Sequence, residues 1–312
     1  MINLLYSLNY KLSNNHPLLE KTKLNSLFRY LLRNVANYLL PLYFRMTNQP
    51  QNKHAEVTIP VVVSLTSFPV RIGKLWVVVE AMLRQCPRPE RVILWLSRAQ
   101  FPNETADLPN RLLEQQSRGL EIRFVDGDIR SHKKYFYVFK EFADKYVLTI
   151  DDDLLFPSTF VDDAYKCAIA HPNSVIAHFG SIFCWRSEID YFEKLCTPVH
   201  PGQTGLNLFF GSGGGTLFPP NRMGYLMDDI STILRLCPTA DDIYLNALCR
   251  IAGCEVTFRN IYPLLSIENK NDEKLHDCNG YLFSPNSANA RQLRDIVKYC
   301  IDKYGKNPFD VQ

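Results

Sequence analysis

Short apolar runs rich in β-branched residues alternate with helix-like segments through the middle of the chain. The runs are IPVVVSLTSF, RVILWLS, EIRFVD and YVLTI, which begin at residues 59, 91, 121 and 146. Three segments with helical character separate them: LWVVVEAMLRQC, LPNRLLEQQSRG and SHKKYFYVFKEFADK. Buried strands that alternate with helices are typical of a parallel sheet covered on both faces. We therefore predict an α/β fold with a Rossmann-type, mostly parallel sheet flanked by helices.

The charge distribution divides the chain into two parts. The formal net charge is +3, from 35 basic and 32 acidic residues, which is not the polycationic balance typical of nucleic-acid binding. Residues 1–55 nevertheless carry many basic side chains and a single acid, Glu20. We predict a basic helical arm and linker over residues 1–55, one domain over residues 56–312, and no nucleic-acid partner.

The cysteines indicate the compartment. There are nine, scattered and without a Cys-x-x-Cys pair. Such usage suits a reducing environment better than a disulfide framework, and it provides no zinc spacing. The chain shows no secretory signal pattern and no apolar stretch long enough to span a membrane. We therefore expect a cytoplasmic protein.

The segment from Leu24 to Met46 has apolar residues at the spacing of one helix face. They are Leu24, Leu27, Phe28, Leu31, Val35, Tyr38, Leu39 and Leu42. Arg29 and Arg33 lie elsewhere on the helix wheel, so we predict an amphipathic helix. Two interpretations stay open. The helix packs on the body of the protein or on a partner subunit, or it lies in the headgroup region of an anionic membrane, which would place the protein at the inner face of the cytoplasmic membrane.

Three consecutive carboxylates, Asp151, Asp152 and Asp153, follow the fourth predicted strand. Their mutual repulsion is unfavourable unless something positive lies between them. A solvated turn or a helix cap could also contain such a cluster, but the carboxyl edge of a parallel sheet is where ligands bind. Alternate residues of an extended segment face the same side, so Asp151 and Asp153 can act together. Hard oxygen ligands of this kind predict a site for Mg²⁺ or Mn²⁺ shared with substrate phosphates.

Five segments occur in a fixed order within residues 57–259: VSLTSFPVRI, RSHKKYF, TIDDDLLFP, GSGGGTLFPP and PTADDIYL. In this order they resemble nucleotide-sugar glycosyltransferases of the GT-A fold, especially bacterial family-2-like enzymes that build surface polysaccharides. The resemblance implies that Asp151 and Asp153 hold Mn²⁺ or Mg²⁺ against the donor diphosphate. It implies that Asp152 contacts the donor ribose or sugar. The metal would neutralise charge on the departing nucleoside diphosphate.

The same resemblance implies a catalytic base. In inverting members, an acidic pair at the start of a helix carries the base that takes the proton from the acceptor hydroxyl. That position corresponds to Asp242, with Asp241 as the close alternative. Acids in a first helical turn also complement the helix dipole, so simple capping stays open as an alternative.

Further donor contacts are implied at the end of the first strand, at the start of a helix and in the glycine-rich segment. These residues are Thr66, Ser67, Arg71, Lys134, Gly213 and Gly214. A flexible hairpin would also use the glycines, and our alignment of Lys134 can shift by one residue. Trp185 could be a sugar platform or a packing residue. His276 could complete a metal site, although we expect it to be a surface residue.

Together these features predict a metal-dependent glycosyltransferase. It would transfer a sugar from a nucleotide-diphosphate sugar, with UDP favoured, to a glycan or lipid-linked glycan acceptor with inversion. The resemblance places this reaction in the synthesis of capsule, lipopolysaccharide or a related surface glycan. Two alternatives stay open: a nucleotidyltransferase, and a non-catalytic protein that binds sugar nucleotides or glycans.

Overall fold

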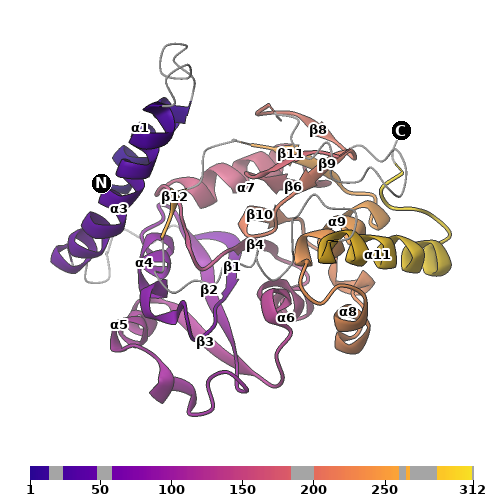
Figure 1. Ribbon diagram of the computed structural model, residues 1–312, viewed down its shortest axis with the longest axis horizontal. Helices are drawn as coiled ribbons and strands as arrows, with labels where there is room; N and C mark the ends of the chain where they lie inside the picture. Colours follow the sequence, from indigo (N-terminus) through magenta and orange to yellow (C-terminus); the bar gives the residue numbers. More distant parts are fainter. Residues whose placement is uncertain (14–23, 48–57, 184–199, 260–264, 268–286, 311–312) are drawn as a thin grey trace.

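The computed structural model describes residues 1–13, 24–47, 58–183, 200–259, 265–267 and 287–310. Figure 1 shows one central sheet with helices on both of its faces and a pair of helices at one side. The predicted α/β fold with a mostly parallel sheet and flanking helices is confirmed. The predicted domain boundary at residues 55 and 56 lies outside the described residues.

The central sheet has eight strands in the order β3-β2-β1-β4-β10-β6-β11-β8. Strands β1, β2, β3 and β4 are mutually parallel, whereas β10 runs antiparallel to both of its neighbours, β4 and β6. The bounds are β1 Thr58–Thr66, β2 Arg88–Ser97, β3 Leu120–Val125, β4 Tyr146–Ile150, β6 Ser174–Ala177, β8 Thr204–Gly205, β10 Gly214–Phe218 and β11 Glu255–Phe258. Two small sheets pair β12 (Leu265–Ser266) with β5 (Leu154–Leu155), and β7 (Gly180–Ile182) with β9 (Leu208–Phe210).

Alternation along the strands produces two cores, one on each face of the sheet. In β1, Val61 and Val63 belong to one core, and Val62 belongs to the other. The first core includes side chains of α4 (Ile72–Leu83), α5 (Asn110–Glu114) and α7 (Phe160–Ala170). The second includes side chains of α6 (Lys133–Glu141), α8 (Ile230–Leu236), α9 (Asp241–Ile251) and α11 (Ala288–Tyr304). Because both faces of β1 are covered, its sequence reads as a continuous apolar run.

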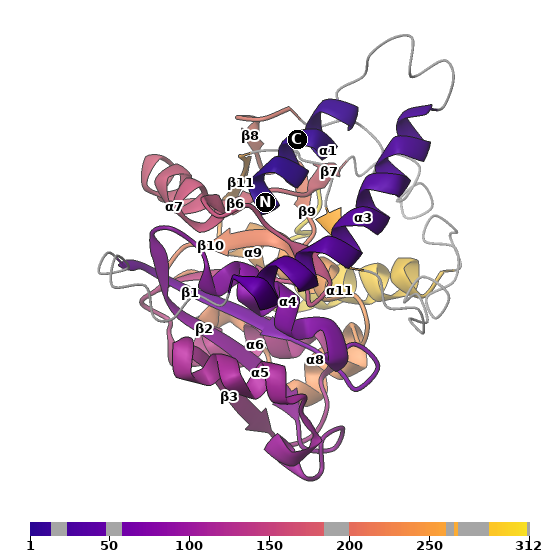
Figure 2. The same cartoon turned by 90° about the vertical axis from the view of Figure 1, so that its left-hand side faces the viewer.

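The amino-terminal arm consists of two helices, α1 (Ile2–Ser13) and α3 (Leu24–Met46). Figure 2 looks onto the side of the molecule where both helices lie next to each other. The helix α3 packs on the body of the protein, as one of the two interpretations expected, but not through the predicted apolar face. A different side of the helix is buried, with Ala36, Leu40 and Phe44 in the core, while the predicted face is exposed. No helix among the described residues is long and apolar enough to cross a membrane.

The glycine-rich segment is not a flexible hairpin. It leads into β10, a fully buried strand between β4 and β6. Its antiparallel direction brings the amino end of β10 to the carboxyl end of β4, where Gly214 pairs with Ile150. The sheet order thus places the glycines directly beside the three aspartates.

Candidate functional site

The three aspartates lie at the carboxyl end of β4, next to the end of β1. The backbone N–H of Asp151 donates to the carbonyl of Gly213 at 2.9 Å, which extends the pairing of β4 with the glycine-rich segment. The side chain of Asp151 is 43% exposed, that of Asp153 is 24% exposed, and that of Asp152 is only 7% exposed. The outer two carboxylates can therefore be reached from solvent, and the middle one is part of the interior.

Two residues from the loop after β1 hold this cluster. The Ser67 hydroxyl donates to Oδ2 of Asp152 at 2.6 Å. One terminal nitrogen of Arg71 bonds both Asp152, at 2.9 Å, and Asp153, at 3.0 Å. Burial raises the pKa of Asp152, and the Arg71 charge and the Ser67 hydrogen bond oppose that rise. Arg71 thus supplies the positive charge that the adjacent carboxylates require.

Lys134, in the first turn of α6, connects two acidic groups that are far apart in the sequence. Its Nζ lies 2.8 Å from Oδ1 of Asp151 and 2.9 Å from Oδ2 of Asp241, and only 4% of its side chain is exposed. Burial lowers the pKa of a lysine, but the carboxylates of Asp151, Asp241 and Asp242 outweigh it and raise the pKa of Lys134. Lys134 therefore stays charged in the interior.

The acidic pair begins α9, and Ser212 connects the pair to the glycine-rich segment. The Ser212 hydroxyl donates to Asp241 and its backbone N–H donates to Asp242, both at 2.6 Å. Burial would raise the pKa of Asp241, but the charge of Lys134 holds it well below its usual range. Burial and the neighbouring Asp241 charge raise the pKa of Asp242 to about 6. The pair thus separates into a permanent anion and a carboxyl that can exchange a proton near neutral pH.

His132 lies buried behind the acidic pair. Its Nε2 lies 2.7 Å from the carbonyl oxygen of Cys237, so this nitrogen carries the hydrogen. Its Nδ1 then accepts from the Tyr135 hydroxyl at 2.6 Å. Burial lowers the pKa of His132, so the ring is neutral at physiological pH. These bonds hold the start of α6 in place, and Lys134 lies in the first turn of that helix.

The glycines allow close packing at the site. A Cβ on Gly213 would overlap the Asp151 carboxylate, and one on Gly214 would overlap the side chain of Phe179. Gly215 has a φ of +89°, and a Cβ there would meet the ring of Phe160. The protein's own packing therefore accounts for glycine at these positions.

The structure brings most of the predicted site residues to one edge of the sheet. One group of contacts joins Ser67 and Arg71 to Asp152 and Asp153. A second joins Lys134 to Asp151 and Asp241, and Ser212 connects Asp241 to Asp242. Thr66 ends β1 and bonds the carbonyl of Trp95 at 2.8 Å. Lys133, the alternative to Lys134 by one residue, pairs instead with Asp128. Trp185 and His276 lie outside the described residues.

Sequence reasoning missed Ser212 and the buried His132–Tyr135 pair. Ser212 sits between two glycines, and its contact with α9 depends on a chain reversal that no local pattern reveals. The pair had a weak signal, because a histidine and a tyrosine three residues apart share a helix face. Nothing in that spacing indicates burial.

A protein-family model matches part of the chain. Residues 69–194 match the model of the glycosyl transferase family 64 domain, a segment that contains Arg71, Lys134 and the three aspartates. The chain is a glycosyltransferase. This match favours sugar transfer over the nucleotidyltransferase and the non-catalytic binding protein. No curated protein matches this glycosyltransferase in sequence.

Solved glycosyltransferase structures are similar to the enzyme at low sequence identity. The mannosyltransferase PcManGT from Pyrobaculum calidifontis, in complex with GDP-Man and Mn²⁺, has a TM-score of 0.45 and 14% identity, covering 89% of this chain and 77% of that chain. TarS 1–349 from S. aureus, in complex with UDP-GlcNAc, has a TM-score of 0.47 and 11% identity, covering 81% and 68%. The S. aureus TarS crystal structure has a TM-score of 0.41 and 11% identity, covering 66% and 36%. We assign the fold of the glycosyltransferase from the order and direction of its own strands.

Proposed function

We propose that the enzyme transfers a sugar from a nucleoside-diphosphate sugar to a glycan hydroxyl, with inversion at the anomeric carbon. The observation that carries this proposal is the double contact of Lys134 with Asp151 and Asp241. It joins the strand-end aspartates, which suit a diphosphate and its metal, to an acidic pair that suits a general base. This contact supports the proposal because the groups assigned to the donor and to the base lie next to each other.

A divalent metal fits the aspartate cluster. Among the described residues, no group of three or more His, Cys, Asp or Glu side chains could hold a metal unaided. Mg²⁺ and Mn²⁺ commonly bind through one or two carboxylates, with water and substrate phosphates completing the site. The partly exposed carboxylates of Asp151 and Asp153 match that arrangement, so we assign them as the residues that hold it. When bound, the ion supplies charge neutralisation at the diphosphate leaving group.

Several side chains around the metal would bind and orient the donor. Lys134 and Arg71 are fixed cations beside the carboxylates and suit the diphosphate. Ser67 and Thr66, at the end of β1, suit the nucleoside, and Asp152 suits a ribose or sugar hydroxyl. We also propose that the donor sugar contacts backbone groups of Gly213 and Gly214, since these glycines lie directly beside Asp151. UDP is our preferred nucleotide.

Asp242 is the proposed base. The acceptor oxygen attacks the anomeric carbon, the bond from that carbon to the diphosphate oxygen breaks, and Asp242 takes the acceptor proton. Its raised pKa makes it a better proton acceptor than an ordinary aspartate while leaving it ionised at neutral pH. Asp241, which Lys134 and Ser212 hold as an anion, positions the pair and keeps the pKa of Asp242 high.

The proposed acceptor is a growing surface glycan or lipid-linked glycan, such as bacterial capsule or lipopolysaccharide. The motif order supports this assignment, and the basic arm supports a reaction at the inner face of the cytoplasmic membrane. Residues 24–46 are the proposed membrane contact.

A panel of UDP-, GDP- and CMP-sugars tests the proposal. The purified enzyme is mixed with each donor in Mn²⁺ or in EDTA, and release of the nucleotide is measured. We expect release from one donor class with Mn²⁺ and none with EDTA. If every donor stays intact and none shifts the thermal unfolding midpoint of the enzyme, the proposed donor site is wrong.

A further inference from the structure

Both helices of the amino-terminal arm expose large apolar side chains. We call the following set of them the outer stripe. It consists of Leu4 and Leu8 in α1 and of Leu24, Leu27, Phe28, Leu31, Val35, Tyr38, Leu39, Leu42 and Met46 in α3, all of them exposed. The α3 members recur every three or four residues, so they lie along one face. At 1.5 Å per residue, the 23 residues of α3 extend about 34 Å. Exposed apolar surfaces of this extent mark interaction sites.

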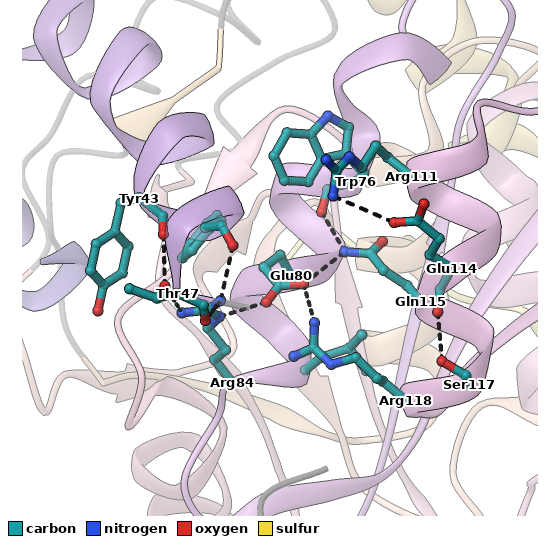
Figure 3. Close-up of polar contacts among 12 residues, drawn as sticks. Tyr43, Thr47, Trp76, Glu80, Arg84, Arg111, Glu114, Gln115, Ser117 and Arg118 are labelled. Carbon is teal, nitrogen blue, oxygen red and sulfur yellow. Dashed lines mark hydrogen bonds and ion pairs between the residues drawn. The ribbon is translucent and has the colours of Figure 1, made fainter. Parts of the chain in front are cut away.

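Buried contacts fix which side of α3 faces outward. Figure 3 shows Arg84 at the end of α4 reaching the last turn of α3. Its guanidinium donates to the hydroxyl of Thr47 at 2.9 Å and to its carbonyl at 3.0 Å, and it stacks over the ring of Phe44. Glu80 pairs with Arg84 and Arg118, at 2.6 Å each, and is almost fully buried. Rotating α3 to hide the outer stripe would break this network, so the exposure of the stripe is built into the fold.

The arm also contacts the segment that follows Asp151, Asp152 and Asp153. The Tyr6 hydroxyl donates to the carbonyl of Leu155, and Asn3 bonds Ser158. From α3, Asn37 donates to the carbonyl of Ser266, whose strand β12 pairs with β5. Leu154 and Leu155 come directly after Asp153. These contacts anchor the arm to the segment that follows the proposed donor site.

The charge of the arm identifies the kind of partner. The sequences of α1 and α3 contain Lys11, Arg29, Arg33 and Arg45 and no acidic residue. Lys11 is exposed on the same face of α1 as Leu4 and Leu8, at helical spacing. Exposed tyrosines, including Tyr10, Tyr30 and Tyr38, add side chains that favour the water–lipid boundary. A second copy of the same arm would bring like charges together, whereas anionic lipid headgroups complement them.

From these observations we infer that the outer stripe is a docking surface for an anionic lipid bilayer, with α1 and α3 lying in the headgroup region. This inference extends the membrane contact of the proposed function and specifies the face and the lipid charge. It does not depend on the chemistry of sugar transfer, since a bilayer binds the arm whether or not a donor is present.

Vesicle flotation with the full chain tests this inference. Vesicles of phosphatidylcholine alone are compared with vesicles of phosphatidylcholine and phosphatidylglycerol in equal parts, at low and high salt. We expect the chain to float with the anionic vesicles and to float less at high salt, because salt screens surface charge. The double substitution Leu31→Glu with Val35→Glu should lower the partition coefficient about tenfold or more, because it removes apolar area from the contact. If the native chain does not float with anionic vesicles, the inference is overturned.

Matched controls separate the outer stripe from general effects. Ile169→Glu with Ile301→Glu changes residues exposed by 56% and 47%, similar to Leu31 and Val35 at 48% and 46%, but in α7 and α11. This control should float like the native chain, and an equal loss would contradict a role for the stripe.

Lys11→Gln, which alters no core contact, should weaken binding to anionic vesicles alone. A native dimer that the Leu31 and Val35 substitutions dissociate, without vesicle binding, would assign the stripe to a second copy instead. Nucleotide release is measured in parallel. A chain that releases nucleotide but does not float would overturn the membrane inference and leave the proposed sugar transfer standing.

Discussion

The carboxylate of Asp151 fills the space that a side chain on Gly213 would need, and its backbone N–H donates to the Gly213 carbonyl at 2.9 Å. This relationship ties the first proposed metal-holding residue to the strand that crosses the middle of the sheet. The position of the Asp151 carboxylate therefore depends on Gly213, which has no functional side chain.

Gly213→Ala should therefore impair turnover without touching a reacting atom. The added methyl group must displace Asp151, and a shift of about 1 Å at a catalytic group can cost about 10²-fold in rate. We expect a fall of that size in kcat at saturating Mn²⁺. Gly73→Ala is the control, because a Cβ at Gly73 meets no atom within 4 Å. Equal kcat values for native enzyme and Gly213→Ala would show that Asp151 does not need its present position.

The pH dependence of kcat/KM tests the assignment of Asp242. A carboxyl with a pKa of about 6 must lose its proton before it can accept another, so kcat/KM should fall about tenfold per pH unit below pH 6. Above that value it should reach a plateau. Asp242→Asn should lower kcat about 10²- to 10⁴-fold and remove the step near pH 6 from the residual activity. A native profile that is flat between pH 5 and pH 8 would reject Asp242 as the base.

Removal of the charge on Lys134 should destabilise the fold as well as the site. Lys134→Gln leaves the buried Asp241 without its cation, and breaking a buried ion pair of this kind costs about 3–5 kcal/mol. Urea unfolding measures this change in the free energy of unfolding.

Lys133→Gln is the matched control for Lys134→Gln. Lys133 is equally buried, but its partner Asp128 is 25% exposed and can be solvated when the lysine is removed. The loss of stability should be smaller, and donor turnover should change less than in Lys134→Gln. Equal losses of turnover in both variants would remove the special role of Lys134.

Buried His178 makes the fold sensitive to acid. Burial lowers its pKa from 6.5 to about 4, so the unfolded chain binds a proton that the folded chain does not. The folded state therefore loses stability as pH falls from about 6.5 towards 4, by roughly 2–3 kcal/mol at pH 4.5. His178→Gln should remove this loss, so its unfolding free energy should fall less than that of the native chain between pH 7.5 and pH 4.5. Parallel pH dependence in the two proteins would contradict the prediction.

The parallel half of the fold could be predicted from the sequence because its signals are local. β1, β2 and β4 contain continuous apolar runs, whereas β3 alternates apolar with charged residues. Each strand ends at a polar segment that the sheet brings to one edge. Asp151 to Asp153 were recognisable because they follow such a run directly. The contact of Ser67 and Arg71 with those aspartates follows from β1 and β4 being neighbours.

Contacts that depend on the other half of the sheet could not be predicted. The glycine-rich segment has no strand-like alternation, and only its place between β4 and β6 makes it a buried strand. The ion pair of Lys134 with Asp241 joins residues that are far apart in the sequence, and no local pattern predicts that they meet. In α3, spacing revealed an apolar face, but the side that packs is set by Arg84 and its contacts with Phe44 and Thr47.

The most direct test of the account is whether nucleoside diphosphate binding requires both a metal and Asp153. UDP is titrated calorimetrically into the native enzyme and into Asp153→Ala, each in Mn²⁺ and in EDTA, with unfolding midpoints measured to show that both proteins are folded. The account predicts binding to the native enzyme with Mn²⁺, and binding at least about tenfold weaker, which corresponds to about 1.4 kcal/mol, when either the metal or the carboxylate is removed. Binding of equal strength in all four titrations would contradict the proposed role of the three aspartates.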